Sequence, residues 1–281
     1  MLSYRHAFHA GNHADVLKHL TLIEVLDYFN RKPAPYWYVD THAGAGCYAT
    51  EGKMADKLGE IHGGVGALVS WAEAPDPVRR FLTVVGCQDR LGATYPGSPM
   101  IAAGLMRPED GLRLFELHPA DFERLETQFA GQGRRVQVRR SDGFAALKAL
   151  LPPAPRRAVV LIDPPYEVKG DYDTVVQALD QGLRRFASGC YLIWYPVLGR
   201  EDSRVLPERL RKRVDGHFSW LDARLHVAST APSGLGMNGS GMFVVNPPYL
   251  LRERLAQALP ALAERLATGP GARHELDGRQ L

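Results

Sequence analysis

The chain has 281 residues, of which 45% are apolar and 23% are charged, and its formal net charge is +3. This length and apolar content suit one large globular domain, or a domain with an inserted subdomain, that buries a sizeable core. The sequence argues against a membrane protein, because no stretch approaches the roughly 20 uncharged apolar residues that a span needs. The first residues also lack the apolar stretch of a signal peptide, so we expect a cytoplasmic protein.

The cysteines and the net charge identify no special class of protein. Cys47, Cys87 and Cys190 lie far apart and form no CxxC pair. This spacing predicts neither a disulfide framework nor a thiolate metal site. A small positive charge is compatible with a polyanionic partner but does not identify one.

The hydrophobic pattern alternates between strands and helices along the chain. Helices are predicted near 15–29, 120–129, 172–186, 206–214 and 250–266, with a further helix ending at 150. Strands are predicted near 36–39, 112–115, 136–138, 158–162, 190–195, 218–227 and 242–245. This alternation predicts an α/β fold with a mainly parallel, doubly wound sheet, helices on both faces, and ligands at the carboxyl ends of the strands.

Residues 47–99 interrupt this alternation. The segment is helical, polar and turn-rich in character, and it predicts an inserted helical subdomain. The main domain then consists of residues 1–46, which include an N-terminal arm, and residues 100–281. We expect the tail after Gly269 to be loose.

The strongest chemical motif is Asp163-Pro164-Pro165-Tyr166, directly after an apolar strand. An adenine amine is a poor nucleophile because its lone pair is delocalised into the ring, and hydrogen-bond acceptors can localise that pair. The Asp163 carboxylate and the Pro164 carbonyl can each accept one N–H of the amine. Tyr166 can stack on an extruded base, a contact of about 1 to 3 kcal/mol. Alone, the motif could be a rigid turn; with the loops described next, it predicts an amino-methyltransferase.

The segment Asn246-Pro247-Pro248-Tyr249 is a rival for this role. It also follows an apolar run, and the side-chain carbonyl of asparagine could also accept from an adenine amine. The order of the strands favours Asp163, which ends the fourth strand counted from Asp40, near a glycine-containing loop. Asn246 ends one of the last strands, and we interpret it as a turn.

Acidic residues close two other predicted strands. Asp40 precedes a loop of small residues at 41–46, and Glu116 closes the next clear strand. This pattern suits S-adenosylmethionine, whose amino group would be held by a carboxylate and whose ribose offers two hydroxyls. Residues 44–49 also match GxGxxA, which raises a nicotinamide dehydrogenase as a competitor. That motif normally has an acidic residue about 20 positions later, whereas Glu116 lies much further on, so a methyltransferase is favoured.

The pair Asp142-Gly143 closes the third strand. The Asp142 carboxylate could accept from the adenine amine of the cofactor, and Gly143 would let the backbone approach the ring. Equally, Ser141 or Asp142 could cap the following helix. Both interpretations can hold together.

The N-terminus is dense in aromatic side chains, namely Tyr4, His6, His9, His13 and His19. Histidines at these spacings could bind a metal, but no carboxylate or cysteine pattern completes a site, so we predict no metal. An extended arm of this kind beside the active site fits contact with RNA or with the cofactor better.

Together, these residues resemble the bacterial 23S ribosomal RNA (adenine-N6)-methyltransferase J family from Met1 to about Leu266. The segments that carry the resemblance are Leu2-Ser3-Tyr4-Arg5-His6, Gly11 through His19, Asp40 through Gly46, Tyr95-Pro96-Gly97-Ser98-Pro99, Glu116-Leu117-His118-Pro119, Asp142-Gly143 and Asp163 through Tyr166. The long N-terminal signature is the most specific, whereas the catalytic tetrad alone indicates only an amino-methyltransferase.

The resemblance implies a Rossmann-like class I methyltransferase that uses S-adenosylmethionine to methylate N6 of one adenine in 23S ribosomal RNA. We expect a monomer whose partner is this RNA. The residues assigned to the cofactor are Lys18, His19, His42, Gly44, Ser98, Glu116, Asp142, Gly143 and Asp163. The residues assigned to the RNA are Tyr4, His6 and Tyr166, and catalysis is assigned to Asp163, Pro164 and Tyr166.

Two alternatives to this function stay open at the level of sequence. The target could be an adenine in DNA, although no long DNA-reading domain is apparent. The chain could also be a non-catalytic RNA-binding or ribosome-assembly factor that retains a nucleotide-binding fold. The intact motif at Asp163 argues against that second alternative.

Overall fold

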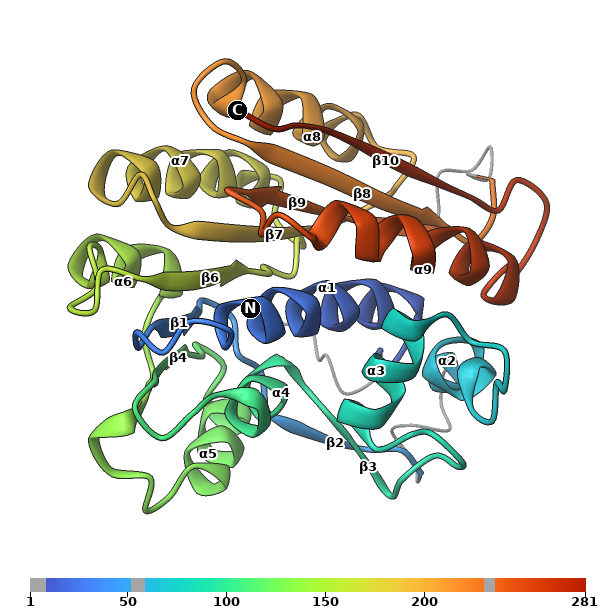
Figure 1. The fold of residues 1–281 in the computed structure, drawn as a ribbon, viewed down its shortest axis with the longest axis horizontal. Helices are drawn as coiled ribbons and strands as arrows, with labels where there is room; N and C mark the ends of the chain where they lie inside the picture. The colour runs from blue at the N-terminus through green and yellow to red at the C-terminus, as the bar shows by residue number, and fades with distance from the viewer. Residues whose placement is uncertain (1–8, 52–58, 230–235) are drawn as a thin grey trace.

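A computed structural model describes residues 9–51, 59–229 and 236–281 of the chain (Figure 1). At its centre lies an eight-stranded sheet with the strand order β10-β8-β9-β7-β6-β1-β4-β5. The strands are β1 (Trp37–Asp40), β4 (Gly111–Phe115), β5 (Val136–Arg139), β6 (Ala158–Ile162), β7 (Cys190–Pro196), β8 (Trp220–His226), β9 (Gly239–Val245) and β10 (Arg273–Arg279). All five residues of β6 are buried, as expected for a central strand that is covered on both faces.

The directions of the strands bring most of their carboxyl ends to one edge of the sheet. Five neighbours, β5, β4, β1, β6 and β7, run parallel. β9 pairs antiparallel with β7, and β8 pairs antiparallel with β9. β8 therefore runs in the same direction as β7, and its carboxyl end reaches the same edge. The predicted mainly parallel, doubly wound sheet is confirmed, and this edge is where its ligands are expected.

Helices cover both faces of the sheet, and each face has its own core. On one face lie α1 (His13–Phe29), α3 (Asp76–Val85), α4 (Ser98–Leu105), α5 (Pro119–Gln128) and α9 (Leu251–Arg265). On the other face lie α6 (Gly143–Leu150), α7 (Gly170–Arg185) and α8 (Glu201–Val214). Among the described residues, no helix is both long enough and apolar enough to cross a membrane.

The first helix begins at a strong cap. The Asn12 side chain accepts hydrogen bonds from the backbone N–H groups of Ala14 and Asp15, at 3.0 and 3.1 Å. Such a cap satisfies backbone donors that would otherwise have no partner. α1 runs antiparallel to β1, so this capped end lies at the carboxyl edge of the sheet. α1 therefore delivers the side chains of its first turns to the ligand-binding edge.

The segment between 47 and 99 is only partly helical. It contains α2 (Glu60–Gly63) and α3, but it begins with β2 (Cys47–Ala49) and closes with β3 (Thr94–Pro96), which pair antiparallel. The insertion is also tied to the start of the chain. Glu60 accepts a hydrogen bond from Asn12 Nδ2 at 2.9 Å and lies 3.0 Å from His9 Nδ1. The insertion and the N-terminal end of α1 therefore support each other.

The expectation of a loose tail after Gly269 is wrong. Residues Arg273–Arg279 form β10, which pairs antiparallel with β8 from Arg273 opposite His226 to Arg279 opposite Trp220. The strand covers the edge of β8, whose backbone groups would otherwise have no partners in the sheet. Its side chains are mostly polar and partly exposed, so its hydrophobic pattern gave no sign of a strand.

The pairing of β10 can be tested with Gly278→Ala. A Cβ atom at this position would lie 2.5 Å from the carbonyl oxygen of Trp220. We therefore expect this variant to lower the free energy of unfolding by more than about 1 kcal/mol, measured by chemical denaturation.

The matched control is Gly104→Ala, at an exposed position in α4 where an added Cβ meets nothing within 4 Å. We expect it to leave the free energy of unfolding unchanged or to raise it by about 0.5 to 1 kcal/mol. Equal stabilities of the two variants would mean that β10 does not pair as described.

Candidate active site

Four acidic residues that the sequence singles out lie at the carboxyl edge of the sheet. They are Asp40 at the end of β1, Glu116 directly after β4, Asp142 after β5 and Asp163 directly after β6. β1 lies between β4 and β6, so the ends of these three strands are neighbours. The structure therefore brings together the residues expected to bind a cofactor and the residue expected to act on the substrate.

Asp163 is held by an ion pair with the first helix. Lys18 Nζ lies 2.7 Å from Asp163 Oδ2 and 2.8 Å from Asp15 Oδ1. Burial alone would lower the pKa of Lys18, but the two carboxylates outweigh it and hold that pKa well above its usual value. The ammonium group thus stays charged, and it also lies 5.9 Å from the ring centroid of Trp194.

The sequence assigns Lys18 to the cofactor but does not indicate both of its partners. Asp15 lies three residues before Lys18 on the same helix, and residues at this spacing are neighbours on a helix surface. That spacing is a usable signal for the first ion pair. The pairing with Asp163, 145 residues away, has no local signal.

Asp40 is buried at the end of β1. Its Oδ2 accepts hydrogen bonds from the hydroxyls of Ser98 and Tyr38, each at 2.7 Å. Burial raises the pKa of Asp40 to about 6, although these two hydrogen bonds lower it and the charge of Asp163 raises it further. Ser98 is the first residue of α4, so the loop Tyr95 to Pro99 is attached to the first strand through this carboxylate.

The loop after β1 is closed by Glu116. One carboxylate oxygen of Glu116 accepts from the backbone N–H of Gly44 at 2.8 Å, and the other accepts from that of His118 at 2.7 Å. Gly44 has a φ of 63°, and an added Cβ would lie 2.2 Å from the hydroxyl of Tyr48. A side chain at position 44 would therefore be both strained and crowded.

His42 lies in the same loop. Its Nδ1 is 2.8 Å from the hydroxyl oxygen of Thr41, and its ring packs edge-on against Phe144, with centroids 4.8 Å apart. Burial lowers the pKa of His42 to about 4, against the opposing charges of Asp163 and Asp142. The imidazole is therefore neutral at physiological pH.

Asp142 caps α6, since its carboxylate accepts from the backbone N–H of Phe144 at 2.9 Å. This leaves room for a role in cofactor binding as well, because the residue is exposed. Gly143 also meets a constraint within the protein, and its approach to the cofactor ring stays a prediction. A Cβ there would lie 2.0 Å from the carbonyl oxygen of Thr41, so the glycine is required by contact between two loops of the protein itself.

His19 lies in the core. It is 1% exposed, and its Nδ1 is 2.7 Å from the hydroxyl of Tyr95. Tyr95 belongs to β3, directly before the loop that carries Ser98. In this conformation His19 supports that loop, and a direct contact with a cofactor stays a prediction.

Tyr166 is buried beside β7 in this structure. It is 3% exposed, and its hydroxyl donates to the carbonyl oxygen of Trp194 at 2.7 Å. Its ring packs against Tyr172 and Trp194, with centroids 4.8 and 5.9 Å away. In this structure Tyr166 attaches the catalytic loop to β7, and its stacking on an extruded base stays a prediction. Its φ of 53° is part of the sharp turn that this attachment requires.

Two expectations about the N-terminal arm cannot be placed, because Tyr4 and His6 lie outside the described residues. The described part of the arm begins at His9, which lies beside Glu60. Within residues 9–51, 59–229 and 236–281, no group of three or more histidine, cysteine or acidic side chains is arranged to hold a metal ion.

The rival segment at Asn246 lies at the opposite edge of the sheet. β9 runs antiparallel to β7, so residues after β9 emerge at the amino end of β7. The Asn246 side chain donates to the carbonyl oxygens of Ala187 and Gly189, each at 2.8 Å. It therefore stabilises a turn, as expected from the order of the strands.

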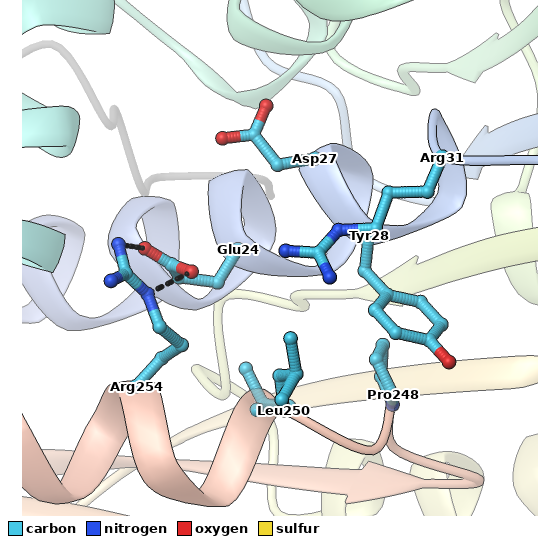
Figure 2. Close-up of a pocket in the computed structure, with 8 residues that line it drawn as sticks. Glu24, Asp27, Tyr28, Arg31, Pro248, Leu250 and Arg254 are labelled. Carbon is cyan, nitrogen blue, oxygen red and sulfur yellow. Dashed lines mark hydrogen bonds and ion pairs between the residues drawn. The ribbon is translucent and has the colours of Figure 1, made fainter.

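Figure 2 shows the surroundings of this second segment. Pro248 faces Tyr28 near the C-terminal end of α1, and Arg254 forms a bidentate ion pair with Glu24 at 2.8 and 3.0 Å. The small cavity between them has a volume of about 30 Å³, which is room for a single water molecule. An adenine base would not fit there.

Comparisons with known proteins identify the family of the chain. Residues 33–276 match the family described as ribosomal RNA large subunit methyltransferase D, RlmJ. Ribosomal RNA large subunit methyltransferase J of Escherichia coli (strain K12) is 42% identical over 268 residues, which cover 95% of this chain and 94% of the relative. The protein of the same name from Haemophilus influenzae is 41% identical over 269 residues, with the same shares of the two chains covered.

A solved structure gives the same picture at the level of the fold. The crystal structure of protein LPL1258 from Legionella pneumophila is 30% identical, with a TM-score of 0.84, and the match covers 97% of this chain and 98% of that one. With a family match over most of its length and two relatives above 40% identity, the chain belongs to the RlmJ family of ribosomal RNA large subunit methyltransferases.

Proposed function

We propose that the protein transfers a methyl group from S-adenosylmethionine to N6 of one adenine in 23S ribosomal RNA. The observation that carries this proposal is the position of Asp163. Its carboxylate lies directly after β6, held by Lys18, beside the loop that Asp40 and Glu116 organise. An acceptor for an adenine amine and a set of groups suited to S-adenosylmethionine thus share one edge of the sheet.

The residues at the ends of β1, β4 and β5 fit the cofactor chemically. The carboxylate of Glu116 can accept hydrogen bonds from the ribose hydroxyls of the cofactor. The exposed carboxylate of Asp142 can accept one from its adenine amine. Asp40 and Ser98 can hold the methionine part of the cofactor, whose ammonium group is attracted to a carboxylate. The neutral ring of His42 and the glycine backbone at position 44 can lie close to the ligand without adding charge. When bound, S-adenosylmethionine supplies an electrophilic methyl group on a sulfonium.

Asp163 and Pro164 act on the adenine amine. Lys18 occupies Asp163 Oδ2, so we assign Oδ1 to accept one N–H of the amine, while the carbonyl of Pro164 accepts the other. These two acceptors localise the nitrogen lone pair and orient it for in-line attack. The proton that the nitrogen loses after the transfer passes to Asp163 or to solvent.

Lys18 is assigned as a positioning residue, in place of the direct cofactor contact expected from the sequence. Its ammonium already lies within 2.8 Å of two carboxylates, and a sulfonium would repel a further cation. Tyr166 is likewise assigned to holding the loop, because its hydroxyl is bonded to β7.

The function is tested by incubating the enzyme with labelled S-adenosylmethionine and protein-free large-subunit ribosomal RNA from cells that lack the enzyme. N6-methyladenosine at one position, identified by mass after digestion, is the expected result. Label in DNA supplied in parallel would favour a DNA target. Binding of RNA without transfer to any nucleic acid would favour a non-catalytic factor.

Replacement of Asp163 separates its chemical role from cofactor binding. We expect Asp163→Ala to lower kcat at least 100-fold, since transition-state acceptors of this kind contribute roughly that much. Asp163→Asn keeps one carbonyl acceptor and should lose less. The control Asp173→Ala removes an exposed carboxylate of α7 that pairs with Arg209, and it should be fully active. An Asp163→Ala enzyme with normal kcat would exclude the proposed mechanism.

Replacement of Lys18 tests its positioning role. Lys18→Met leaves two carboxylates near each other without their cation, a loss of about 3 to 5 kcal/mol for a buried pair. We expect lower thermal stability and a kcat reduced more than 10-fold, with partial recovery in Lys18→Arg. The affinity for S-adenosylmethionine, measured by calorimetry, should change less than kcat. A variant that loses only cofactor affinity would show that Lys18 contacts the cofactor directly.

The raised pKa of Asp40 predicts how cofactor binding depends on pH. A cofactor ammonium near Asp40 requires the ionised carboxylate, and in the free protein that carboxylate takes up a proton as the pH falls through about 6. The affinity for S-adenosylmethionine should therefore fall as the pH is lowered from 7 to 5, a range in which an α-amino group stays charged.

The control for this measurement is Asp40→Asn, which cannot titrate. It should bind more weakly at pH 7 and show a smaller change between pH 7 and 5. Burial also raises the pKa of Glu116, but Glu116 is present in both proteins, so the difference between them reports on Asp40. Identical pH profiles for the two proteins would place the cofactor ammonium elsewhere.

A further inference from the structure

A second cavity, of about 430 Å³, opens at the same edge of the sheet as the catalytic loop. It is lined by residues at the carboxyl ends of β7 and β8, by the start of α8 and by the first residues of β10. In Figure 1 these elements lie together on the opposite side of β6 from β4 and β5, whose ends carry the groups assigned to the cofactor. The cavity therefore lies on the other side of the catalytic loop from the groups assigned to the cofactor.

The cavity lies close to the catalytic loop. Tyr166 is bonded to the backbone of Trp194, and the next residue, Tyr195, lines the cavity. Tyr166 also packs on Tyr172, and the guanidinium of Arg200 lies 5.8 Å from the centroid of that ring. The end of β7 thus connects the cavity to the loop that carries Asp163.

Three arginines and one acid line the cavity. The guanidinium of Arg224 forms ion pairs with the carboxylates of Asp222, at 2.6 Å, and Glu275, at 3.1 Å. Arg273 lies 3.3 Å from Glu275. Arg204, on the first turn of α8, pairs with no carboxylate in the described part of the chain, and both Arg204 and Arg273 are exposed. The lining thus has three guanidinium groups and one carboxylate, and this excess of positive charge favours an anionic ligand.

The rest of the lining is suited to a flat, partly apolar group. Val197, Leu198 and Pro207 supply apolar surface, and His226, which is 6% exposed, supplies a ring with polar atoms. The volume lies within the range of about 300 to 1,000 Å³ that is typical of sites for small ligands. A base against the apolar wall and a phosphate at the arginines would use both parts of the lining.

We propose that this cavity receives a nucleotide of the substrate RNA next to the target adenine, with its phosphate bound by Arg204 and Arg273. The inference rests on the proposed function. An adenine must leave its stack to reach Asp163, and its neighbours are then unstacked beside the catalytic loop. Proteins that hold such strands combine basic groups for the backbone with surfaces for the bases. The cavity offers basic groups and an apolar wall, and it lies at the same edge of the sheet as the catalytic loop.

The test compares two double variants that remove equal charge. Arg204→Ala with Arg273→Ala removes the two exposed arginines of the cavity. Arg184→Ala with Arg185→Ala removes two exposed arginines at the C-terminal end of α7, which lies at the opposite edge of the sheet. Methyl transfer to protein-free ribosomal RNA is measured for both and for the unmodified enzyme, as a function of RNA and salt concentration.

For the cavity variant we expect the KM for RNA to rise about 10-fold, with kcat at saturating RNA and the Kd for S-adenosylmethionine within about threefold of the unmodified enzyme. The slope of log KM against log salt should fall by about 0.7 to 0.9 for each RNA phosphate that the variant no longer neutralises. The α7 variant should match the unmodified enzyme. Equal KM and equal slopes for the two double variants would overturn the inference.

A binding experiment keeps this inference separate from the proposed function. RNA that carries photoreactive uridines is crosslinked to the unmodified enzyme, and the attached peptides are identified by mass spectrometry. Crosslinks within residues 196–207 or 224–226 support the cavity as an RNA site, even if no methyl transfer is seen and the proposed function fails. Methyl transfer with crosslinks only elsewhere would retain the function and overturn the inference.

Discussion

The arrangement of the active edge depends on one buried ammonium group. Lys18 lies within 2.8 Å of both Asp15 and Asp163, and a buried cation of this kind is tolerated only when it is paired. Because the two carboxylates belong to α1 and to the loop after β6, the pairing fixes the first helix against the catalytic loop. Glu60 fixes the insertion to the same end of α1 through Asn12. The N-terminal end of α1 and the start of α2 are thereby attached to the residue assigned to catalysis.

The antiparallel strand β9 has a separate consequence for the site. Since it lies between β7 and β8, β8 runs in the direction of β7 and its end reaches the catalytic edge. β10 then begins at that edge, opposite His226. The edge therefore continues beyond the catalytic loop for four more strands, and that extension holds the cavity with Arg204 and Arg273. A purely parallel sheet that ended at β7 would have no wall for a neighbouring nucleotide.

Most strands could be predicted from the sequence because they are buried on both faces. The run 158–162 is wholly apolar, so the end of this strand could be predicted. The position of Asp163 at the carboxyl end of the strand could be predicted with it. Residues whose role depends on distant partners could not be predicted in the same way. Tyr166 has the side chain of a stacking residue, and only the folded structure shows that its ring is buried and that its hydroxyl is bonded to Trp194. β10 is polar and pairs with a strand 47 or more positions earlier, so neither its composition nor its neighbours in sequence indicate it.

The side chains assigned on the two sides of the catalytic loop differ in charge. In the proposed arrangement, this difference decides on which side the RNA backbone binds. On the side of β1, β4 and β5, the acidic groups assigned to the cofactor are Asp40, Glu116 and Asp142, although β5 itself ends in the exposed Arg139. These carboxylates attract an ammonium or hydroxyl groups and repel phosphates. On the side of β7, β8 and β10, the exposed side chains of the cavity include Arg204 and Arg273. In the proposed arrangement, an RNA backbone that approaches Asp163 is drawn to Arg204 and Arg273, and the side of β1, β4 and β5 is left to the methyl donor.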